Sequence, residues 1–595
     1  MVRNRRGPQV ALYPEWVRNV AHKAVISGLG IALALGMPAS AIALDGAIGN
    51  ASSTSESSQP STVKDDGYGS GYVVVHAAKG NEGVKYQARQ IFKADVIDSD
   101  TTDVSEISAD DPSTNLTGKV ETNIAWATED VQKAIEKVIA DNGGTEADIA
   151  TAQDAAAWIQ KNVQSDSAAD VEAGKGTRVA SESVANQLAA ALIANDINTE
   201  HEPIEIDDGE QARLGSGMWL LTTDSESLQK NQTGTSPILA IVGGGTVAIT
   251  EKASVPSLTK EVQENSTGEW GLSGDFNIGE TIPYRLTGTL PDNFGTFSTY
   301  YYEFSDHLSD GLTADSSSIK VTASNGKEAL DVTEDFDIEY GSDNTLHVVC
   351  QDIRKIDGVT KDTKFIVEYT ARLNGKAVVG SKGNPNTVEL IYSSNPNYDG
   401  HGETTPHENI VYTYKLSLVK LDASSSTTHL AGARFTLQAA DGSYVQADGS
   451  KGSQAYEFVT DNDGNIEVSG LDAGVYRLSE TQAPAGYDRI GRDVSITITS
   501  AKDQTSLTSL TAAISGNQQA SISSTAINTG EIAMRVTDMP TTTPPDTERI
   551  PNLGTGIGAW IAIASGAALV GIGGYQLHQR RKNPAGRTDG EGNKQ

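Results

Sequence analysis

Cysteine is almost absent from this sequence. Its 595 residues include one, Cys350, so no disulfide can form within a chain. Any covalent reinforcement must therefore come from other chemistry. Cys350 ends the apolar run LHVVC, which predicts a small buried side chain.

Positive charge and aromatic side chains are also scarce. Lys and Arg total 45 against 78 Asp and Glu, the formal net charge is -33, and aromatic residues make up 6%. This charge argues against nucleic acid as a partner and is typical of soluble surface proteins. The length and the shortage of large apolar side chains predict several modest, β-rich domains instead of one large core.

Enzyme motifs are missing from the sequence. Its nine histidines are scattered singly, and it contains no HExxH, no GxSxG and no glycine loop that would hold a phosphate. The GGG run at 243–245 and DNDGN at 461–465 are interpreted as turns, since the second lacks the downstream Glu of a calcium loop. We expect no enzyme activity, no cofactor and no metal.

The N-terminus has the composition of a secretion signal. An Arg-rich leader precedes the apolar run AVISGLGIALALGMPA, and small residues follow it. This pattern predicts a signal peptide over residues 1–43, cleaved near Ala41 or Ala43. Residues 44–68 are rich in Ser and Gly and are expected to form a flexible segment.

The C-terminal segment, residues 541–595, has three parts. A Pro/Thr spacer, TTTPPDTE, precedes an apolar run at 557–577 that is long enough to cross a bilayer, and basic residues follow at 580–582. A plain membrane anchor would account for the last two parts. The whole arrangement resembles the LPxTG sorting signal of Gram-positive wall-anchored proteins.

The pentapeptide of this signal can be aligned in two registers. The first register substitutes Ile for Leu and Leu for Thr, and the second keeps Thr-Gly but loses Pro. The resemblance implies that a sortase would cleave after Leu553, or after Thr555 in the second register, and transfer the chain to an amine. The candidate signal comprises Ile550, Pro551, Asn552, Leu553, Gly554, Thr555 and Gly556.

Three domains are expected between the two ends, at 69–255, 256–413 and 414–540. The first combines strand-like runs with helical periodicity over 128–142 and 178–195. The other two contain alternating strands separated by Gly and Asp turns. The predicted fold class is mainly β, with tandem immunoglobulin-like β-sandwich domains and additional helices in the first domain. The resemblance given in the next paragraph implies that these sandwiches are of the CnaA/CnaB type.

Several motifs resemble the backbone pilins of Gram-positive bacteria. YRLSETQAPAGY is similar to the E-box of their CnaB-like (SpaA-type) domains. PSLTKEV, YEFSDHLSDGLT and GNPNTVELIYSSNP resemble their D2 domain, and YQARQIF and SPILAIVGGG resemble their N-terminal domain. The resemblance covers essentially the whole mature chain and implies a major pilin subunit. The alternative is a monomeric wall-anchored adhesin built of the same modules.

The resemblance implies an intramolecular isopeptide bond, formed without an enzyme, in the second domain. Lys260 would attack the side-chain carbonyl of Asn386, and Asp306 would transfer protons while ammonia leaves. Burial favours this chemistry, because it disfavours the charged forms of both the amine and the acid. Packing would also hold the two reacting groups at a high effective concentration.

In the third domain the matching lysine is Lys420 and the matching acid is Glu480. The family usually has an Asn acceptor near the last strand, where this chain has Asp538. Two alternatives follow. Asp538 accepts the amine with loss of water, which we favour because an unpaired buried lysine would be costly, or the three side chains form an ion-pair cluster.

A polymer would need an amine on each subunit to receive the sorting signal of the next one. GGGTVAITEK occupies the position of the family's WxxxVxVYPK motif, with Gly243, Thr250 and Glu251 in place of Trp, Tyr and Pro. We expect Lys252 to be the acceptor, mainly because of its position. Lys79 is a weaker candidate.

The partners implied by this resemblance are all extracellular. They are class C and housekeeping sortases, further copies of this chain, minor pilins, peptidoglycan, and host-cell glycan or matrix receptors. The expected location is a secreted, wall-anchored fimbrium that functions in adhesion.

Overall fold

The computed structural model describes residues 67–98, 119–163, 182–194, 203–251 and 253–541. The predicted signal peptide, the sorting signal, the apolar run at 557–577 and Lys252 lie outside these residues. Within the described ranges, no helix is long and apolar enough to cross a membrane.

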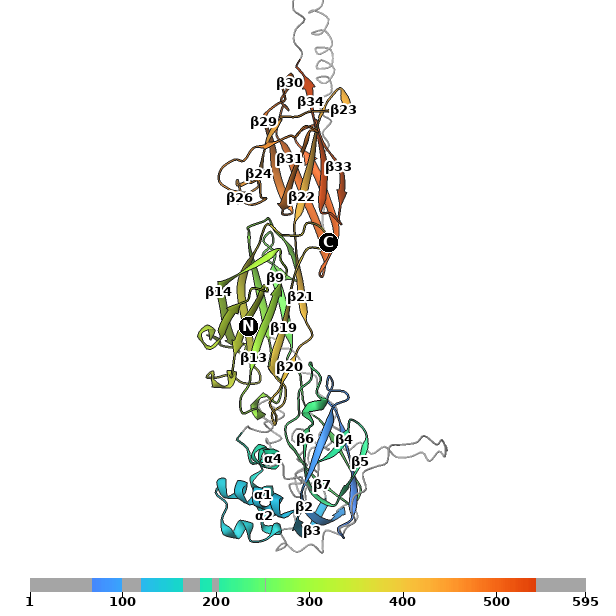
Figure 1. Cartoon of the computed structure of the whole chain (residues 1–595), viewed down its shortest axis with the longest axis vertical. Coiled ribbons are helices and arrows are strands. Elements are labelled where there is room, and N and C mark those ends of the chain that lie inside the picture. Colours follow the sequence, from blue (N-terminus) through green and yellow to red (C-terminus); the bar gives the residue numbers. More distant parts are fainter. Residues whose placement is uncertain (1–66, 99–118, 164–181, 195–202, 252, 542–595) are drawn as a thin grey trace, which may run out of the picture.

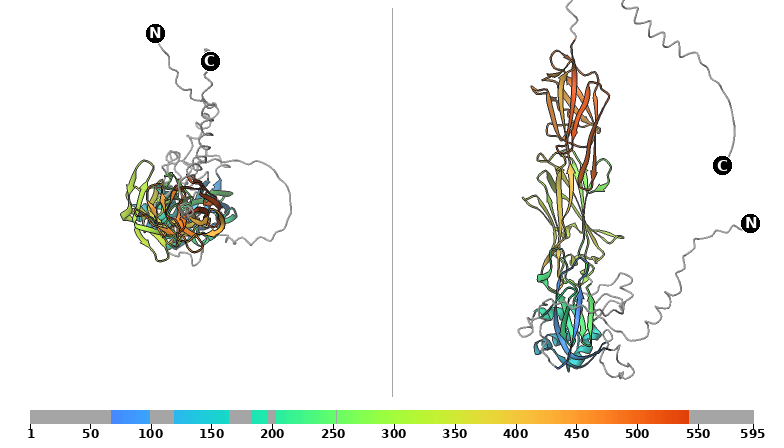
Figure 2. Two further views of the ribbon diagram at one scale, coloured as in Figure 1. Left: turned by 90° about the horizontal axis from the view of Figure 1, so that it is seen from above. Right: turned by 90° about the vertical axis from the view of Figure 1, so that its right-hand side faces the viewer.

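Three β-rich domains lie end to end along the long axis of the molecule (Figures 1 and 2). The first contains all of the α-helices in the described part of the chain, and each of the other two consists of a pair of sheets. This arrangement confirms the predicted fold class, mainly β with tandem sandwich domains and helices added to the first.

The first domain has a three-stranded sheet, β5-β1-β8, and a five-stranded sheet, β3-β2-β6-β7 with β4 beside β2. Strands β6, in the interior of the second sheet, and β7, at its edge, are buried along their whole length, because both of their faces are covered. Met218 and Leu220 pack with the helices, whereas Trp219 and Leu221 pack with β1. The strands are β1 Ser70–His76, β2 Lys85–Asp98, β3 Lys119–Trp126, β4 Ile204–Asp207, β5 Gln211–Gly215, β6 Gly217–Thr223, β7 Ile238–Val242 and β8 Thr246–Thr250.

One of the two hydrophobic cores of this domain lies between the five-stranded sheet and three helices. The helices are α1 (Glu129–Asp141), α2 (Ala152–Asn162) and α4 (Val184–Ala194). The hydroxyl of Thr128 caps α1 by accepting a hydrogen bond from the Val131 amide at 3.1 Å. The first and third helices fall within the predicted helical segments, which are therefore confirmed. Short 3-10 turns lie in the first domain at Glu146–Ile149 and Ser225–Ser227, and in the second domain at Phe294–Thr296, Thr333–Asp335 and Ile353–Lys355.

The second domain is a sandwich of two sheets, β10-β9-β12-β18-β14-β15 and β11-β21-β19-β13-β17-β16, with β20 beside β19. Buried and less buried residues alternate along β12, β18 and β19, as expected for strands that present one face to the core. Cys350 ends β17 and is buried, as predicted. The strands are β9 Leu258–Gln263, β10 Trp270–Gly271, β11 Ser273–Asp275, β12 Thr281–Gly288, β13 Tyr302–Leu308, β14 Leu312–Ser324, β15 Ala329–Asp331, β16 Asp337–Tyr340, β17 Thr345–Cys350, β18 Lys364–Leu373, β19 Asn384–Ser393, β20 His401–Glu403 and β21 His407–Tyr412.

The third domain is also a sandwich. One sheet has the order β23-β22-β34-β30, with β28 beside β22 and β33 beside β34, and the other has the order β26-β25-β24-β29-β31-β32, with β27 beside β24. The first and last long strands, β22 and β34, pair in parallel. The strands are β22 Tyr414–Asp422, β23 Ser425–His429, β24 Arg434–Ala439, β25 Tyr444–Val445, β26 Lys451–Gly452, β27 Phe458–Val459, β28 Asn465–Leu471, β29 Gly474–Gln482, β30 Tyr487–Asp488, β31 Val494–Asp503, β32 Ser506–Ser515, β33 Ala520–Ala526 and β34 Glu531–Pro540.

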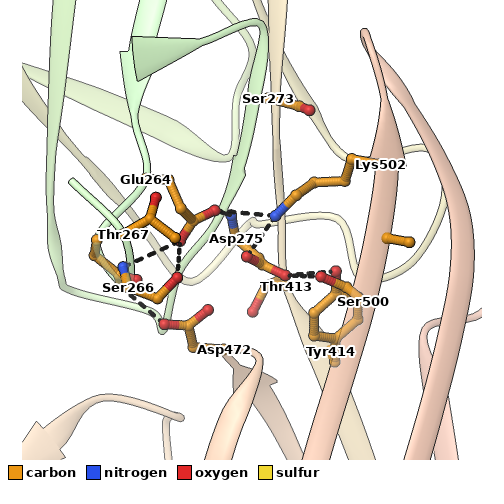
Figure 3. Close-up of polar contacts among 12 residues, drawn as sticks. Glu264, Ser266, Thr267, Ser273, Asp275, Thr413, Tyr414, Asp472, Ser500 and Lys502 are labelled. Atoms are coloured by element: carbon orange, nitrogen blue, oxygen red, sulfur yellow. Dashed lines mark hydrogen bonds and ion pairs between the residues drawn. The ribbon is translucent and has the colours of Figure 1, made fainter. Parts of the chain in front are cut away.

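A polar junction connects the second and third domains (Figure 3). Only Thr413 separates β21 from β22, and its buried hydroxyl donates to the carbonyl of Leu471 at 3.1 Å. Lys502, from the third domain, contacts Asp275 at 2.6 Å and Glu264 at 3.0 Å, both from the second domain. The short connection and these ion pairs restrict bending between the two domains.

Candidate functional site

Two clusters of buried ionisable side chains stand out in the described part of the chain, one in each sandwich. In the second domain, the cluster comprises Lys260 on β9, Asp306 on β13 and Asn386 on β19, and each is at most 1% exposed. The structure therefore brings together all three residues that sequence analysis assigned to this domain.

The strand register explains how these side chains meet. On the neighbouring strands β13 and β19, Asp306 lies opposite Val388 and Leu308 lies opposite Asn386. Asp306 and Asn386 are thus two positions apart on one face of their sheet. Lys260 belongs to the facing sheet, and its Nζ donates a hydrogen bond to Oδ1 of Asp306.

Tyr369, on β18, completes this cluster and was not identified from the sequence. Its hydroxyl donates to Oδ2 of Asp306 at 2.5 Å and accepts from Nδ2 of Asn386 at 2.7 Å. Among the described residues, Oδ1 of Asn386 has no hydrogen-bond partner. The inward position of Tyr369 in the alternating strand FIVEYTARL was the only available signal, and it also fits an ordinary core residue.

Burial changes the acid–base properties of Lys260. Loss of solvent lowers the pKa of its ammonium group from 10.5 to about 8, although the neighbouring Asp306 opposes the shift. The ring of Tyr284 lies 5.4 Å from Nζ. The site can therefore hold a neutral amine, which is a nucleophile, much more easily than a solvated lysine can.

The second cluster, in the third domain, comprises Lys420 on β22, Glu480 on β29 and Asp538 on β34. All three side chains are 0% exposed. Nζ of Lys420 contacts Oδ1 of Asp538 and lies 3.0 Å from Oε1 of Glu480. The other oxygen of Glu480 accepts a hydrogen bond from the amide of Ile490 at 2.8 Å. The structure again brings together the residues that sequence analysis assigned to one site.

Strand pairing also sets the geometry of this second cluster. In the parallel pair of β22 and β34, Lys420 lies opposite Val536, so Asp538 is two positions further along on the same face. Glu480 reaches across from the facing sheet. The amine and its prospective acceptor are therefore on adjacent strands, with the acid opposite them.

The charges in this cluster do not balance if every group ionises. Two carboxylates would face one ammonium group in a site with no exposed side chain, and an uncompensated buried charge is costly. Burial raises the pKa of Asp538 to about 6, with Glu480 adding to the shift and Lys420 opposing it. The arrangement thus favours retention of a proton among the carboxyl groups.

The other residues singled out from the sequence fall into two groups. Lys79 is exposed and lines a groove of about 650 Å³ at the boundary of the first and second domains, together with Ser254, Pro256 and Thr404. Lys252 and the candidate sorting signal lie outside the described residues.

Across the ranges that the structure describes, no group of three or more His, Cys, Asp or Glu side chains is arranged to hold a metal ion.

The residue just before Lys252 is held by several contacts. Glu251 is buried, and its Oε2 accepts hydrogen bonds from the amide of Ala78 and the side chain of Asn81, each at 3.0 Å. Burial raises the pKa of this carboxyl group. These contacts fix the end of the segment in which we expect the acceptor.

Two stretches of the chain match known protein families. Residues 278–396 match the Cna-B-like domain of Gram-positive pilin backbone subunit 2, and residues 414–512 match the SpaA prealbumin-like fold domain. The trypsin-resistant surface T6 protein of Streptococcus pyogenes serotype M6 is 31% identical over 261 residues. That match covers 40% of this chain and 44% of the relative, so the chain matches less than half of the relative's length.

Solved pilin structures also resemble the chain. The T6 backbone pilin of serotype M6 Streptococcus pyogenes has a TM-score of 0.46 at 17% identity, and the match covers 81% of this chain and 100% of that chain. The full-length major pilin SpaD from Corynebacterium diphtheriae has a TM-score of 0.42 at 15% identity, with the same two coverages, 81% and 100%. The chain therefore contains a domain of the Gram-positive pilin backbone family at 278–396 and a SpaA prealbumin-like domain at 414–512.

Proposed function

We propose that this protein is the structural major subunit of a covalently polymerised, sortase-assembled pilus on the surface of a Gram-positive bacterium. One observation carries the proposal. Each of the two sandwich domains encloses a lysine in contact with a carboxyl group, in a chain that cannot form an internal disulfide. Such sites suit self-catalysed cross-linking that stiffens a shaft, and the protein would be the substrate of a sortase, not an enzyme.

In the second domain, the proposed bond joins Lys260 to Asn386. Lys260 first gives a proton to Asp306, with which it is in contact. The neutral amine then attacks Cγ of Asn386 and forms the Nζ–Cγ bond. The Cγ–Nδ2 bond breaks, and ammonia leaves with a proton that originates from the amine.

In the third domain, the proposed bond joins Lys420 to Asp538. The amine attacks Cγ of the protonated Asp538, Glu480 carries the proton from the amine to the departing oxygen, and water leaves. The product is a neutral amide, so the reaction removes charge from a site with no solvent access. If the amine and the acceptor stay ionised instead, the cluster remains a set of ion pairs.

The positions of these bonds suit a protein that carries tension along its length. Lys420 and Asp538 lie on the first and last long strands of their domain, and Lys260 and Asn386 connect the first strand of theirs to β19. A force applied through the ends of a domain would pass through the new amide bond. Most of the domain would therefore remain folded under load.

Polymerisation would use parts of the chain outside the described residues. We propose that a sortase cleaves after Leu553, or after Thr555, and transfers the chain to Lys252 of the next subunit. A housekeeping sortase would then join the polymer to peptidoglycan. Minor pilins and host receptors would be further partners in adhesion. The competing function is a monomeric wall-anchored adhesin with the same internal bonds.

Boiling cell-wall extracts in SDS and immunoblotting for this protein would test the function. We expect a high-mass ladder for the native chain, a collapse to monomer for Lys252→Ala, and an unchanged ladder for the control Lys79→Ala. A ladder that survives Lys252→Ala but disappears in Lys79→Ala would move the acceptor to Lys79. Absence of a ladder in the native strain would favour the monomeric adhesin.

A further inference from the structure

We propose that Tyr369 is a catalytic proton relay for cross-linking in the second domain, because its hydroxyl connects Asp306 to the leaving nitrogen of Asn386. This inference rests on the proposed Lys260–Asn386 bond. It adds a named group for the step that expels ammonia.

The hydroxyl of Tyr369 bridges Asp306 and Asn386 by two hydrogen bonds. Asp306 contacts Lys260 through Oδ1 and Tyr369 through Oδ2, so its two oxygens face different partners. The amide nitrogen of Asn386 donates to the Tyr369 hydroxyl at 2.7 Å. A proton taken from the amine can reach the leaving nitrogen along this chain of contacts.

Burial restricts the alternatives for this proton transfer. Asp306 and Asn386 are 0% exposed and Tyr369 is 2% exposed, so bulk solvent does not reach them. Burial, the negative charge of Asp306 and nearby Tyr284 together raise the pKa of Tyr369 well above its usual value. The phenol therefore stays protonated and can accept one proton while it gives up another.

Protons are conserved along this relay. Lys260 first gives a proton to Oδ1 of Asp306, the oxygen that it contacts, and rotation of the carboxyl group turns this protonated oxygen toward Tyr369. As Nζ attacks Cγ, one amine proton passes to the other oxygen of Asp306, and the acid proton passes to the hydroxyl oxygen of Tyr369. The hydroxyl, which donates to Asp306 before the reaction, turns and gives its original proton to Nδ2 of Asn386, and this nitrogen leaves as ammonia. The acid and the phenol both finish with the number of protons they had at the start.

The chain offers a matched control in Tyr284. Its ring stacks on that of Tyr369, with centroids 5.2 Å apart, and it is also fully buried. Its hydroxyl lies near the side chain of Asn386 but, among the described residues, makes no hydrogen bond of normal geometry and does not bridge Asp306 to Asn386. Replacing either tyrosine by Phe removes one buried hydroxyl from the same stacked pair, but only Tyr369→Phe removes the relay.

The test follows cross-linking in time. The chain from residue 69 to residue 541, as wild type, Tyr369→Phe and Tyr284→Phe, would be made by cell-free synthesis, sampled after synthesis stops, and digested. Mass spectrometry would measure the fraction of the peptide pair joined through Lys260 and Asn386. Thermal unfolding of each Phe variant combined with Lys260→Ala, beside Lys260→Ala alone, would show whether the fold is intact.

We expect Tyr369→Phe to slow formation of the joined peptide by roughly 100-fold, the lower part of the range for general acid–base catalysis, and Tyr284→Phe to form it at the wild-type rate. The solvent deuterium isotope effect on the wild-type reaction should fall in Tyr369→Phe. Wild-type kinetics in Tyr369→Phe, or equal slowing in both variants, would overturn the relay. If the wild-type chain never forms the joined peptide, the bond itself is refuted and the relay with it.

Discussion

Lys420 and Asp538 are in contact while both are fully buried, although they are 118 positions apart in the chain. They lie on adjacent parallel strands, and one of these strands opens the third domain while the other closes it. This contact links the sequence motifs to the proposed mechanical role, since a bond here would connect the two points at which force enters and leaves the domain.

Replacing Lys420 by Met should strongly destabilise the third domain. Within the described part of the chain, the substitution removes the cation that contacts both Glu480 and Asp538, and breaking a buried ion pair from one side costs about 3–5 kcal/mol. In a chain that has formed the cross-link, the ion pair no longer exists, and loss of the covalent bond replaces this cost. Denaturant unfolding would measure the change.

Lys415→Met is the matched control for that measurement. Lys415 lies on the same strand, but it pairs with Glu467 at 3.0 Å near the surface. Such pairs contribute about 0–1 kcal/mol, so little change is expected. Equal losses in the two variants would contradict a special role for the buried cluster.

Asp538→Asn tests the chemistry of the acceptor directly. Attack by Lys420 on the native carboxyl group releases water, and attack on the amide of the variant would release ammonia, but both reactions give the same product. The two cross-linked proteins should therefore have identical intact masses. If the cluster is only an ion pair, the two masses will differ as Asp differs from Asn.

Asp472, at the junction in Figure 3, should make stability depend on pH. Burial, reinforced by Asp275, raises its pKa from 3.8 to about 8 in the folded protein. Between those values the folded state binds the proton and the unfolded state does not. This stabilisation is complete below the unfolded pKa and is lost as the pH rises through about 8.

Asp472→Asn should abolish that part of the pH dependence. Calorimetry between about pH 5 and pH 9 would show a Tm that falls less steeply in the variant than in wild type. Asp357→Asn, at an exposed position, is the control and should follow the wild-type curve. A wild-type slope in Asp472→Asn would show that this carboxyl group does not titrate in the range.

Lys502→Met should loosen the connection between the second and third domains. The substitution leaves Asp275 and Glu264 without the ammonium group that both contact across the junction. Small-angle X-ray scattering should show a wider range of interdomain angles than in wild type. Lys361→Met, which removes an ion pair to Asp362 inside the second domain, should leave the scattering curve unchanged.

Much of the architecture could be predicted from the alternating and periodic apolar patterns of this sequence. Alternating runs such as TVELIYS become strands with one buried face, and the periodic segment around Val184 becomes α4. Helix α2 was not singled out, because alanines supply much of its buried surface and leave a weak apolar pattern. The residues of both buried clusters were located through motif resemblance and not through spacing.

Residues that meet only through tertiary packing could not be predicted. Lys502 and Asp275 are 227 positions apart and come together because two domains dock. Tyr369 was missed for a different reason, since a tyrosine at an inward strand position fits an apolar core equally well. Its role becomes visible only when the partners of its hydroxyl are known.

The intact mass of the purified chain from residue 69 to residue 541 tests the central claim most directly. Two internal amide bonds predict a mass lower than that of the sequence by one ammonia and one water. Peptide mapping would assign the losses to the Lys260–Asn386 and Lys420–Asp538 pairs. An unshifted mass would contradict the account, because both clusters would then be ion pairs or hydrogen bonds and no covalent bond would stiffen either domain.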